Sequence, residues 1–278
     1  MKNYDASQQA LYRPELSPTV FGTRPLGPDG ICAELARLAY IRFESGDADE
    51  TRLKLALASA GISEVLTFAT KRTGTQGFGA LDRDGNVYIV FRGTQADDPT
   101  DIGVDVDLRL EPWQAGGRVH NGFSQSLQSI WGAVEQWLKP YDRSKVWITG
   151  HSLGAALATL AASLLPGATL VTFGSPRVGD NQFAALFDGR DVRRHVDCSD
   201  VVTMVPPELL GYRHVGATRY IDQHGALRDW DENTAGDPID KDRWEARAVY
   251  LATLAWRHGN VGSRGLADHA PANYVRAF

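Results

Sequence analysis

A single serine stands between two glycines in the run Gly150-His151-Ser152-Leu153-Gly154, directly after the largely apolar run 146–149. The segment that follows is rich in leucine and small residues and has helical character. Where a strand turns at once into a helix, the residue at the turn is strained and its side chain is exposed. The two glycines lack the Cβ atoms that would collide where strand and helix cross. The pattern therefore predicts that Ser152 is a nucleophile.

A serine hydroxyl needs a base that takes its proton and a carboxylate that orients that base. With a nucleophile of this kind, the three groups follow in the order serine, acid, histidine. The acids in the right part of the chain are Asp180, Asp188, Asp191, Asp197 and Asp200. The histidines late enough are His214, His224, His258 and His269. The residues alone leave both choices open, although the last two acids follow the predicted strand 192–196 most closely.

The other histidines fit a base less well. Consecutive side chains diverge at a sharp turn, so His151 is not expected to reach Ser152. We expect His120 and His214 to be buried structural histidines. An oxyanion also needs two N–H donors, one from the residue after the nucleophile, Leu153, and one from a loop after an earlier strand.

Helical and strand patterns alternate through the middle of the chain, which predicts an α/β fold with a mostly parallel sheet covered on both faces. Residues 82–86 predict a hairpin between strands at 77–81 and 87–91. The clearest amphipathic helix is predicted from Phe123 through Leu138. The remaining expected elements are helices from Pro28, Asp47 and Pro238 and near 181–187, and strands at 65–69, 168–173, 192–196, 212–215 and 218–221.

Residues 1–278 show no linker, repeat or change of composition, so a single domain is expected, with an extended surface arm at 1–27. Hydrophobic residues make up 43% of the chain and charged residues 23%, which is enough for a full core. The net charge of −5 argues against a nucleic-acid partner. Two cysteines cannot form a disulfide framework.

No run approaches the ~20 apolar residues that a membrane helix requires. The N-terminus lacks the apolar stretch of a secretory signal, which favours a cytoplasmic location. A chain trimmed of its signal, or one secreted by another route, fits the same residues. The acidic cluster at 97–107 lacks the glycine and final glutamate of an EF-hand loop, so no metal site is predicted. The residues do not indicate an oligomeric state.

Several ordered blocks of the chain resemble the class 3, fungal-type triacylglycerol lipase family of the α/β-hydrolases. The resemblance covers about 60–220 and 266–274, whereas 222–262 fits the family poorly. The matching blocks are 90–94 (VFRGT), 119–123 (VHNGF), 149–156 (TGHSLGAA), 172–179 (TFGSPRVG), 196–207 with Asp200, and Asp268-His269 with Tyr274.

This resemblance implies an α/β-hydrolase fold in which Ser152 is the nucleophile, Asp200 the orienting acid and His269 the base. It implies that Thr94 joins Leu153 in the oxyanion hole and that Asp107 supports the Thr94 hydroxyl. Asp197 becomes the second choice for the acid. No cofactor is implied.

The implied activity is hydrolysis of acylglycerols or simpler acyl esters through an acyl-enzyme, on a lipid substrate that can lie at a lipid–water interface. The alternatives are a feruloyl-type esterase or phospholipase A1 on the same scaffold, and a non-catalytic binding protein. The lid-like loop 95–112 has apolar residues at alternating positions and no aromatic residue. In this it differs from an amphipathic lid with a bulky apolar face. The insertion 222–262, which carries Trp230, Trp244 and Trp256, is a candidate second lid or a core-packing helix.

Overall fold

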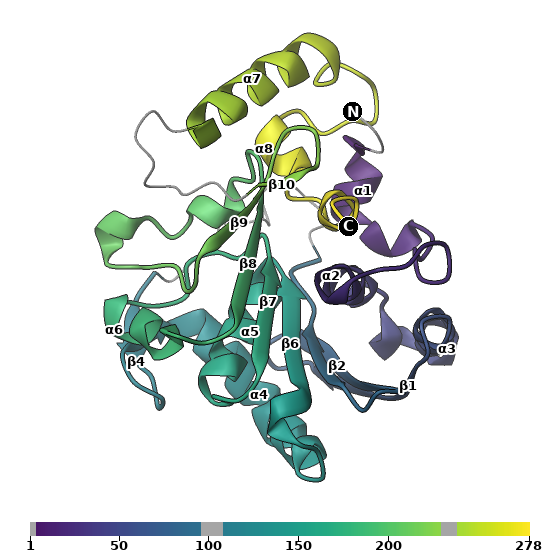
Figure 1. Cartoon of the computed structure of the whole chain (residues 1–278), viewed down its shortest axis with the longest axis vertical. Coiled ribbons are helices and arrows are strands. Elements are labelled where there is room, and N and C mark those ends of the chain that lie inside the picture. Colours follow the sequence, from purple (N-terminus) through teal and green to yellow (C-terminus); the bar gives the residue numbers. More distant parts are fainter. Residues whose placement is uncertain (1–3, 96–107, 229–237) are drawn as a thin grey trace.

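The computed structural model describes residues 4–95, 108–228 and 238–278. Within them, an eight-stranded sheet runs through the centre of the molecule (Figure 1). In spatial order its strands are β1 (Ile62–Thr70), β2 (Thr75–Asp82), β3 (Val87–Phe91), β6 (Val146–His151), β7 (Thr169–Phe173), β8 (Val192–Asp197), β9 (Thr218–Ile221) and β10 (Leu227–Arg228). Strands β3, β6, β7, β8 and β9 are parallel, and the remaining three pair antiparallel at the two edges. The mostly parallel sheet and the 82–86 hairpin are confirmed.

Helices cover both faces of this sheet (Figure 1). The α-helices are α1 (Gln8–Tyr12), α2 (Pro28–Leu38), α3 (Asp47–Ala58), α4 (Asn121–Leu138), α5 (Leu153–Ser163), α6 (Asn181–Ala184), α7 (Pro238–Thr253), α8 (Arg264–Ala267) and α9 (Pro271–Val275). The 3₁₀ turns are Pro14–Leu16, Phe43–Ser45, Arg143–Lys145, Ala185–Phe187, Val202–Met204 and Glu208–Leu210. A separate antiparallel pair joins β4 (Leu110–Pro112) to β5 (Arg118–His120). No helix in the described ranges has the length and apolar character needed to cross a bilayer.

The sheet separates two apolar cores, as β3 illustrates. Val87, Ile89 and Phe91 join the core formed with α4 and α5, whereas Tyr88 and Val90 join the core formed with α2 and α3. Successive side chains of a strand point to opposite faces, so a strand covered on both sides must be apolar throughout. This is why 87–91 has no polar position, and it makes the sheet a rigid base for the loops at its edge.

Two expectations for the chain ends and loops are wrong. The arm at 1–27 is not simply extended, because it contains α1 and the turn Pro14–Leu16. Ala10 and Leu11 of α1 are buried against residues from the C-terminal part of the chain, a contact that local pattern does not reveal. Residues 212–215 are not a strand, since Arg213 forms only an isolated bridge with Gly179. Most of the lid-like loop 95–112, namely 96–107, lies outside the described residues, and 110–112 is β4.

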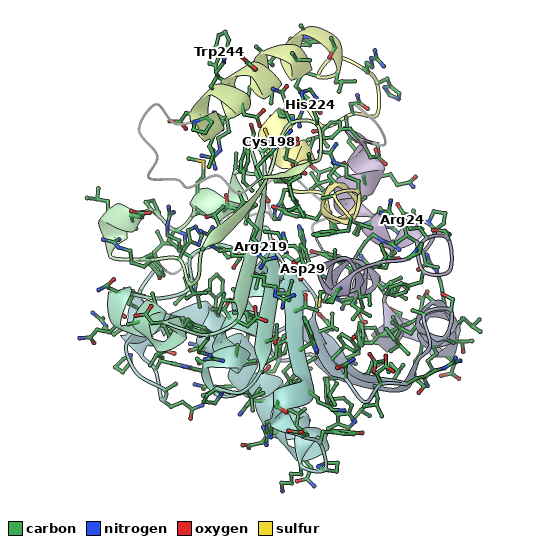
Figure 2. All side chains as sticks on the ribbon, in the orientation of Figure 1. Arg24, Asp29, Cys198, Arg219, His224 and Trp244 are labelled. Carbon is green, nitrogen blue, oxygen red and sulfur yellow. The ribbon has the colours of Figure 1, made fainter. Side chains whose placement is uncertain are left out.

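The predicted helix of the insertion is present as α7, but the exposure of a tryptophan on its outer face was not expected. Trp244 is 72% exposed and lies at the outer side of α7, pointing away from the molecule (Figure 2). The buried residues are Ile239, Asp242, Ala246 and Tyr250. Asp242 Oδ2 accepts hydrogen bonds from Tyr220 Oη at 2.9 Å and from the Gln223 N–H at 2.9 Å. A polar anchor, which periodicity of apolar residues overlooks, therefore sets the orientation of this helix; Trp230 lies outside the described residues.

Candidate active site

Ser152 occupies the turn between β6 and α5 with φ 60° and ψ −129°, and it is the single non-glycine residue with positive φ in the described chain. A Cβ at Gly154 would lie 2.2 Å from the Phe91 carbonyl oxygen, and one at Gly150 would lie 2.3 Å from the Gly154 carbonyl oxygen. Both neighbours are backbone atoms that cannot rotate away. The glycines are therefore required by close approach of strand and helix, as the sequence indicated.

The structure brings Ser152, His269 and Asp200 together. Ser152 Oγ lies 2.9 Å from His269 Nε2, and His269 Nδ1 lies 2.9 and 3.0 Å from the two Asp200 oxygens. A carboxylate only accepts hydrogen bonds, so Nδ1 carries the proton and Nε2 of the neutral ring accepts the serine hydroxyl. All three residues are buried, with Ser152 8% exposed. The arrangement can remove the serine proton and hold the ring while it does so.

The Asp200 carboxylate is held by two further donors. Tyr274 Oη donates to Oδ2 at 2.5 Å, and the Val202 N–H donates to Oδ1 at 2.9 Å. Burial, and then the Asp200 charge, raise the pKa of Tyr274, which keeps its hydroxyl protonated as a donor. Gly174, at φ +57°, packs against the Asp200 carboxylate, because a Cβ there would lie 2.7 Å from Asp200 Oδ2. Asp200 is thus fixed in position on several sides.

His151 faces away from the serine, as expected for consecutive side chains at a turn. Its Nε2 donates to the His269 carbonyl oxygen at 2.7 Å, so its Nδ1 accepts the Tyr40 hydroxyl at 2.8 Å. Burial, together with the neighbouring His269, holds the pKa of His151 well below its usual range. A neutral His151 therefore anchors the backbone of the proposed base.

The other candidate acids have different partners. Asp180 accepts the Phe183 N–H at the start of α6, and Asp191 pairs with Arg193 at 2.6 Å. Asp197 is fully buried, and its nearest cation is Arg276 at 3.6 Å. Burial, and next the Asp268 charge, raise the pKa of Asp197 well above its usual range. A carboxyl held toward its neutral form is a poor orienting anion.

Two histidines predicted to be structural have structural contacts. His214 Nε2 donates to the Thr203 carbonyl oxygen at 2.8 Å. The His120 ring stacks on Phe123 with ring centroids 4.0 Å apart. In neither contact is Ser152 the partner.

Of the two expected oxyanion residues, Leu153 borders the turn, and Thr94 follows a glycine that packs against it. Leu153 is the first residue of α5, where a backbone N–H has no acceptor within the helix. Gly93, which precedes Thr94, packs so closely that a Cβ there would lie 2.6 Å from the His151 carbonyl oxygen. This contact brings the loop after β3 beside the turn. Asp107, the expected support for Thr94, lies outside the described residues.

The sequence did not predict that Tyr40 and His151 hold the backbone of His269, because residues so far apart in the chain leave no local pattern when they meet. Gly174 had a usable signal, since it directly follows a parallel strand adjacent to the one that carries the serine. In the described part of the chain, no three His, Cys, Asp or Glu side chains group in a way that could hold a metal ion.

Comparisons with known proteins find that this chain is similar to lipases. Residues 88–210 match the family described as Lipase (class 3). A secreted mono- and diacylglycerol lipase of Fusarium solani is 36% identical over 176 residues, which are 59% of this chain and 48% of that protein. The chain spans just under half the length of such curated relatives. This relative is named as secreted, which conflicts with the cytoplasmic location predicted above; that location remains a prediction.

Solved structures of lipases share the fold. The lipase of Rhizopus microsporus var. chinensis is similar with a TM-score of 0.55 and 29% identity, over 69% of this chain and 71% of that one. A triacylglycerol lipase whose catalytic centre is a serine protease triad is similar with a TM-score of 0.55 and 25% identity, over 69% of this chain and 77% of that one.

Proposed function

We propose that this chain is a serine hydrolase of the class 3 lipase family that cleaves carboxylic esters, with acylglycerols as its substrate class, because residues 88–210 match that family. The observation that carries the proposal is the 2.9 Å contact between Ser152 Oγ and a histidine ring that Asp200 orients. The names of the mono- and diacylglycerol and triacylglycerol lipases among the relatives support the acylglycerol substrate. A complete serine–histidine–aspartate set disfavours a non-catalytic binding protein.

In the proposed reaction, His269 takes the proton of Ser152 as its Oγ attacks the ester carbonyl carbon. The imidazolium that forms is stabilised by Asp200, and it gives the proton to the departing alcohol. Water then attacks the acyl-enzyme with His269 again as base, which releases the fatty acid and restores the serine. The backbone N–H groups of Leu153 and Thr94 are the proposed donors to the oxyanion.

Exposed apolar side chains in the segment after the acid support action at a lipid surface. The segment that follows Asp200 exposes Met204 by 51%, Leu209 by 95% and Leu210 by 47%. Neighbouring exposed apolar groups on a protein surface can form a contact site for a partner or a lipid. We propose that this segment meets the acyl chains or the surface of an aggregated substrate.

The test is hydrolysis of p-nitrophenyl butyrate, p-nitrophenyl palmitate and an emulsified diacylglycerol by wild type and by Ser152→Ala. We expect turnover by wild type and a loss of about 10⁶-fold in kcat for Ser152→Ala, as in other serine triads. His269→Ala should lose activity to a similar extent, whereas His224→Ala should keep it. Wild type without activity on any ester would overturn the proposal, and full activity of His269→Ala would move the base to another histidine.

A further inference from the structure

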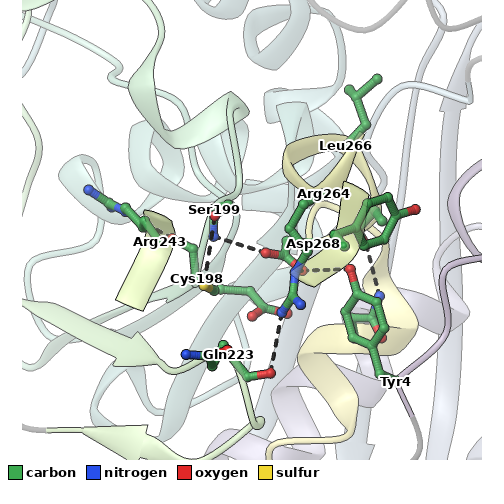
Figure 3. Close-up of polar contacts among 12 residues, drawn as sticks. Tyr4, Cys198, Ser199, Gln223, Arg243, Arg264, Leu266 and Asp268 are labelled. Carbon is green, nitrogen blue, oxygen red and sulfur yellow. Dashed lines mark hydrogen bonds and ion pairs between the residues drawn. The ribbon is translucent and has the colours of Figure 1, made fainter. Parts of the chain in front are cut away.

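The carboxylate immediately before the proposed base is a junction between three parts of the chain. Asp268 is fully buried and accepts three hydrogen bonds (Figure 3). Its Oδ1 accepts Arg264 Nε at 2.6 Å and Tyr4 Oη at 2.8 Å, and its Oδ2 accepts the Ser199 N–H at 2.9 Å. The donors come from α8, from the N-terminal arm and from the segment that carries the acid.

The bond to Ser199 links the acid and the base through their neighbours. Ser199 directly precedes Asp200, just as Asp268 directly precedes His269. The two segments also touch at Gly265, where a Cβ would lie 2.5 Å from Val201 Cγ1. A shift of Asp268 would therefore move the base relative to its acid.

The N-terminal arm reaches the same junction through Tyr4. The Tyr4 ring centroid lies 4.3 Å from the Arg264 guanidinium carbon and 4.6 Å from that of Arg276, within the range of cation–π contact. The backbone of Asp5 exchanges two hydrogen bonds with the buried Asn273 side chain, at 3.0 and 2.8 Å. The arm is thus bonded to the chain on both sides of His269.

We propose that Tyr4 is a positioning residue for the proposed ester hydrolysis, acting through Asp268 to hold the base in register with the acid. The inference rests on the proposed function, and it gives the N-terminal arm a part in turnover beyond its part in stability. The Tyr4 hydroxyl and Arg264 share the same Asp268 oxygen, so together they fix the rotamer that presents the other oxygen to Ser199. A catalytic group displaced by a fraction of an ångström loses much of its effect.

The decisive variant is Tyr4→Phe, which removes the hydroxyl and keeps the ring over both guanidinium groups. We expect kcat for p-nitrophenyl butyrate to fall by about tenfold or more with KM unchanged, because Tyr4 does not line the serine. Tyr250→Phe is the matched control. Its hydroxyl donates to the Val261 carbonyl oxygen at 2.6 Å and its ring packs edge-on against Tyr4, in the same cluster, but Asp268 is not its partner. This control should keep the kcat of wild type.

Thermal unfolding of both variants separates positioning from stability, with the kinetics measured well below the lower midpoint. The proposal holds if the two variants lose similar stability and Tyr4→Phe alone loses kcat. It is overturned if Tyr4→Phe keeps kcat within twofold, or if both variants lose kcat equally. An active wild type with an equally active Tyr4→Phe refutes the positioning role alone, whereas an inactive wild type refutes the proposed function and this inference together.

Discussion

At the scale of single residues, two buried aspartates near the histidine differ in their environment. Asp200 accepts hydrogen bonds from the His269 ring, the Tyr274 hydroxyl and a backbone N–H, so three donors hold its carboxylate in place. Asp197 has no hydrogen-bond partner for either oxygen within the described residues, and burial and the Asp268 charge raise its pKa. The hydrogen bonds, more than the distance along the chain, select the orienting acid.

Asp200→Asn should lower kcat for p-nitrophenyl butyrate by about 10⁴-fold, because an amide favours the wrong tautomer of the histidine. Asp197→Asn is the matched control, because within the described residues no hydrogen bond joins the Asp197 carboxyl to the three proposed catalytic groups, and it should keep kcat within a few-fold. Steady-state kinetics at pH 7.5 measure both. A larger loss for Asp197→Asn than for Asp200→Asn would exchange the two roles.

At the scale of elements, the site depends on how closely α5 passes β3 and β6. The glycines on either side of Ser152 leave room for backbone atoms only. The serine keeps its positive φ because the sheet and the helix fix the chain on both sides of the turn, which is how strained residues persist in folded proteins.

Gly154→Ala should therefore lower the free energy of unfolding by about 2–3 kcal/mol, the cost of an overpacked site. Gly132→Ala is the control within helix α4, because a Cβ there meets no atom within 4 Å. That change should be neutral or stabilise the protein by about 0.5–1 kcal/mol, since alanine favours a helix over glycine. Urea unfolding measures both changes, and equal stability of the two variants would contradict the steric argument.

At the scale of the whole molecule, the surroundings of several histidines disfavour their charged form. Burial is the main cause that lowers the pKa of His151, His195 and His214, and nearby cations add to it at His214. His195 donates to Asp29 Oδ2 at 3.0 Å and stacks on Phe173, yet burial prevails over that carboxylate. The unfolded chain binds protons more readily at these positions than the folded chain does.

The free energy of unfolding should therefore fall as the pH drops below the ordinary histidine value of about 6.5, by up to about 1.4 kcal/mol per pH unit for each such histidine. The pKa of Asp29 is about 2, below the ordinary aspartate value, so this carboxylate stabilises the folded chain until the pH falls below that ordinary value. The pH range in which Asp29 acts is therefore separate from that of the histidines. Urea unfolding between pH 7.5 and 5 measures the slope. His195→Gln should flatten it and the exposed control His258→Gln should not; an unchanged slope in His195→Gln would assign the effect elsewhere.

The residues by themselves determined the serine turn, the hairpin and the long amphipathic helix, because each depends on contacts between near neighbours that a repeating pattern records. They left several acids and histidines open, and resemblance to a family, rather than spacing, singled out Asp200 and His269. Only the tertiary structure brought Ser152 within 2.9 Å of a ring 117 positions later, joined Tyr4 to Asp268 and turned Trp244 outward. Buried hydrogen bonds between distant segments decided these features, and neither periodicity nor local propensity encodes which distant partners will meet.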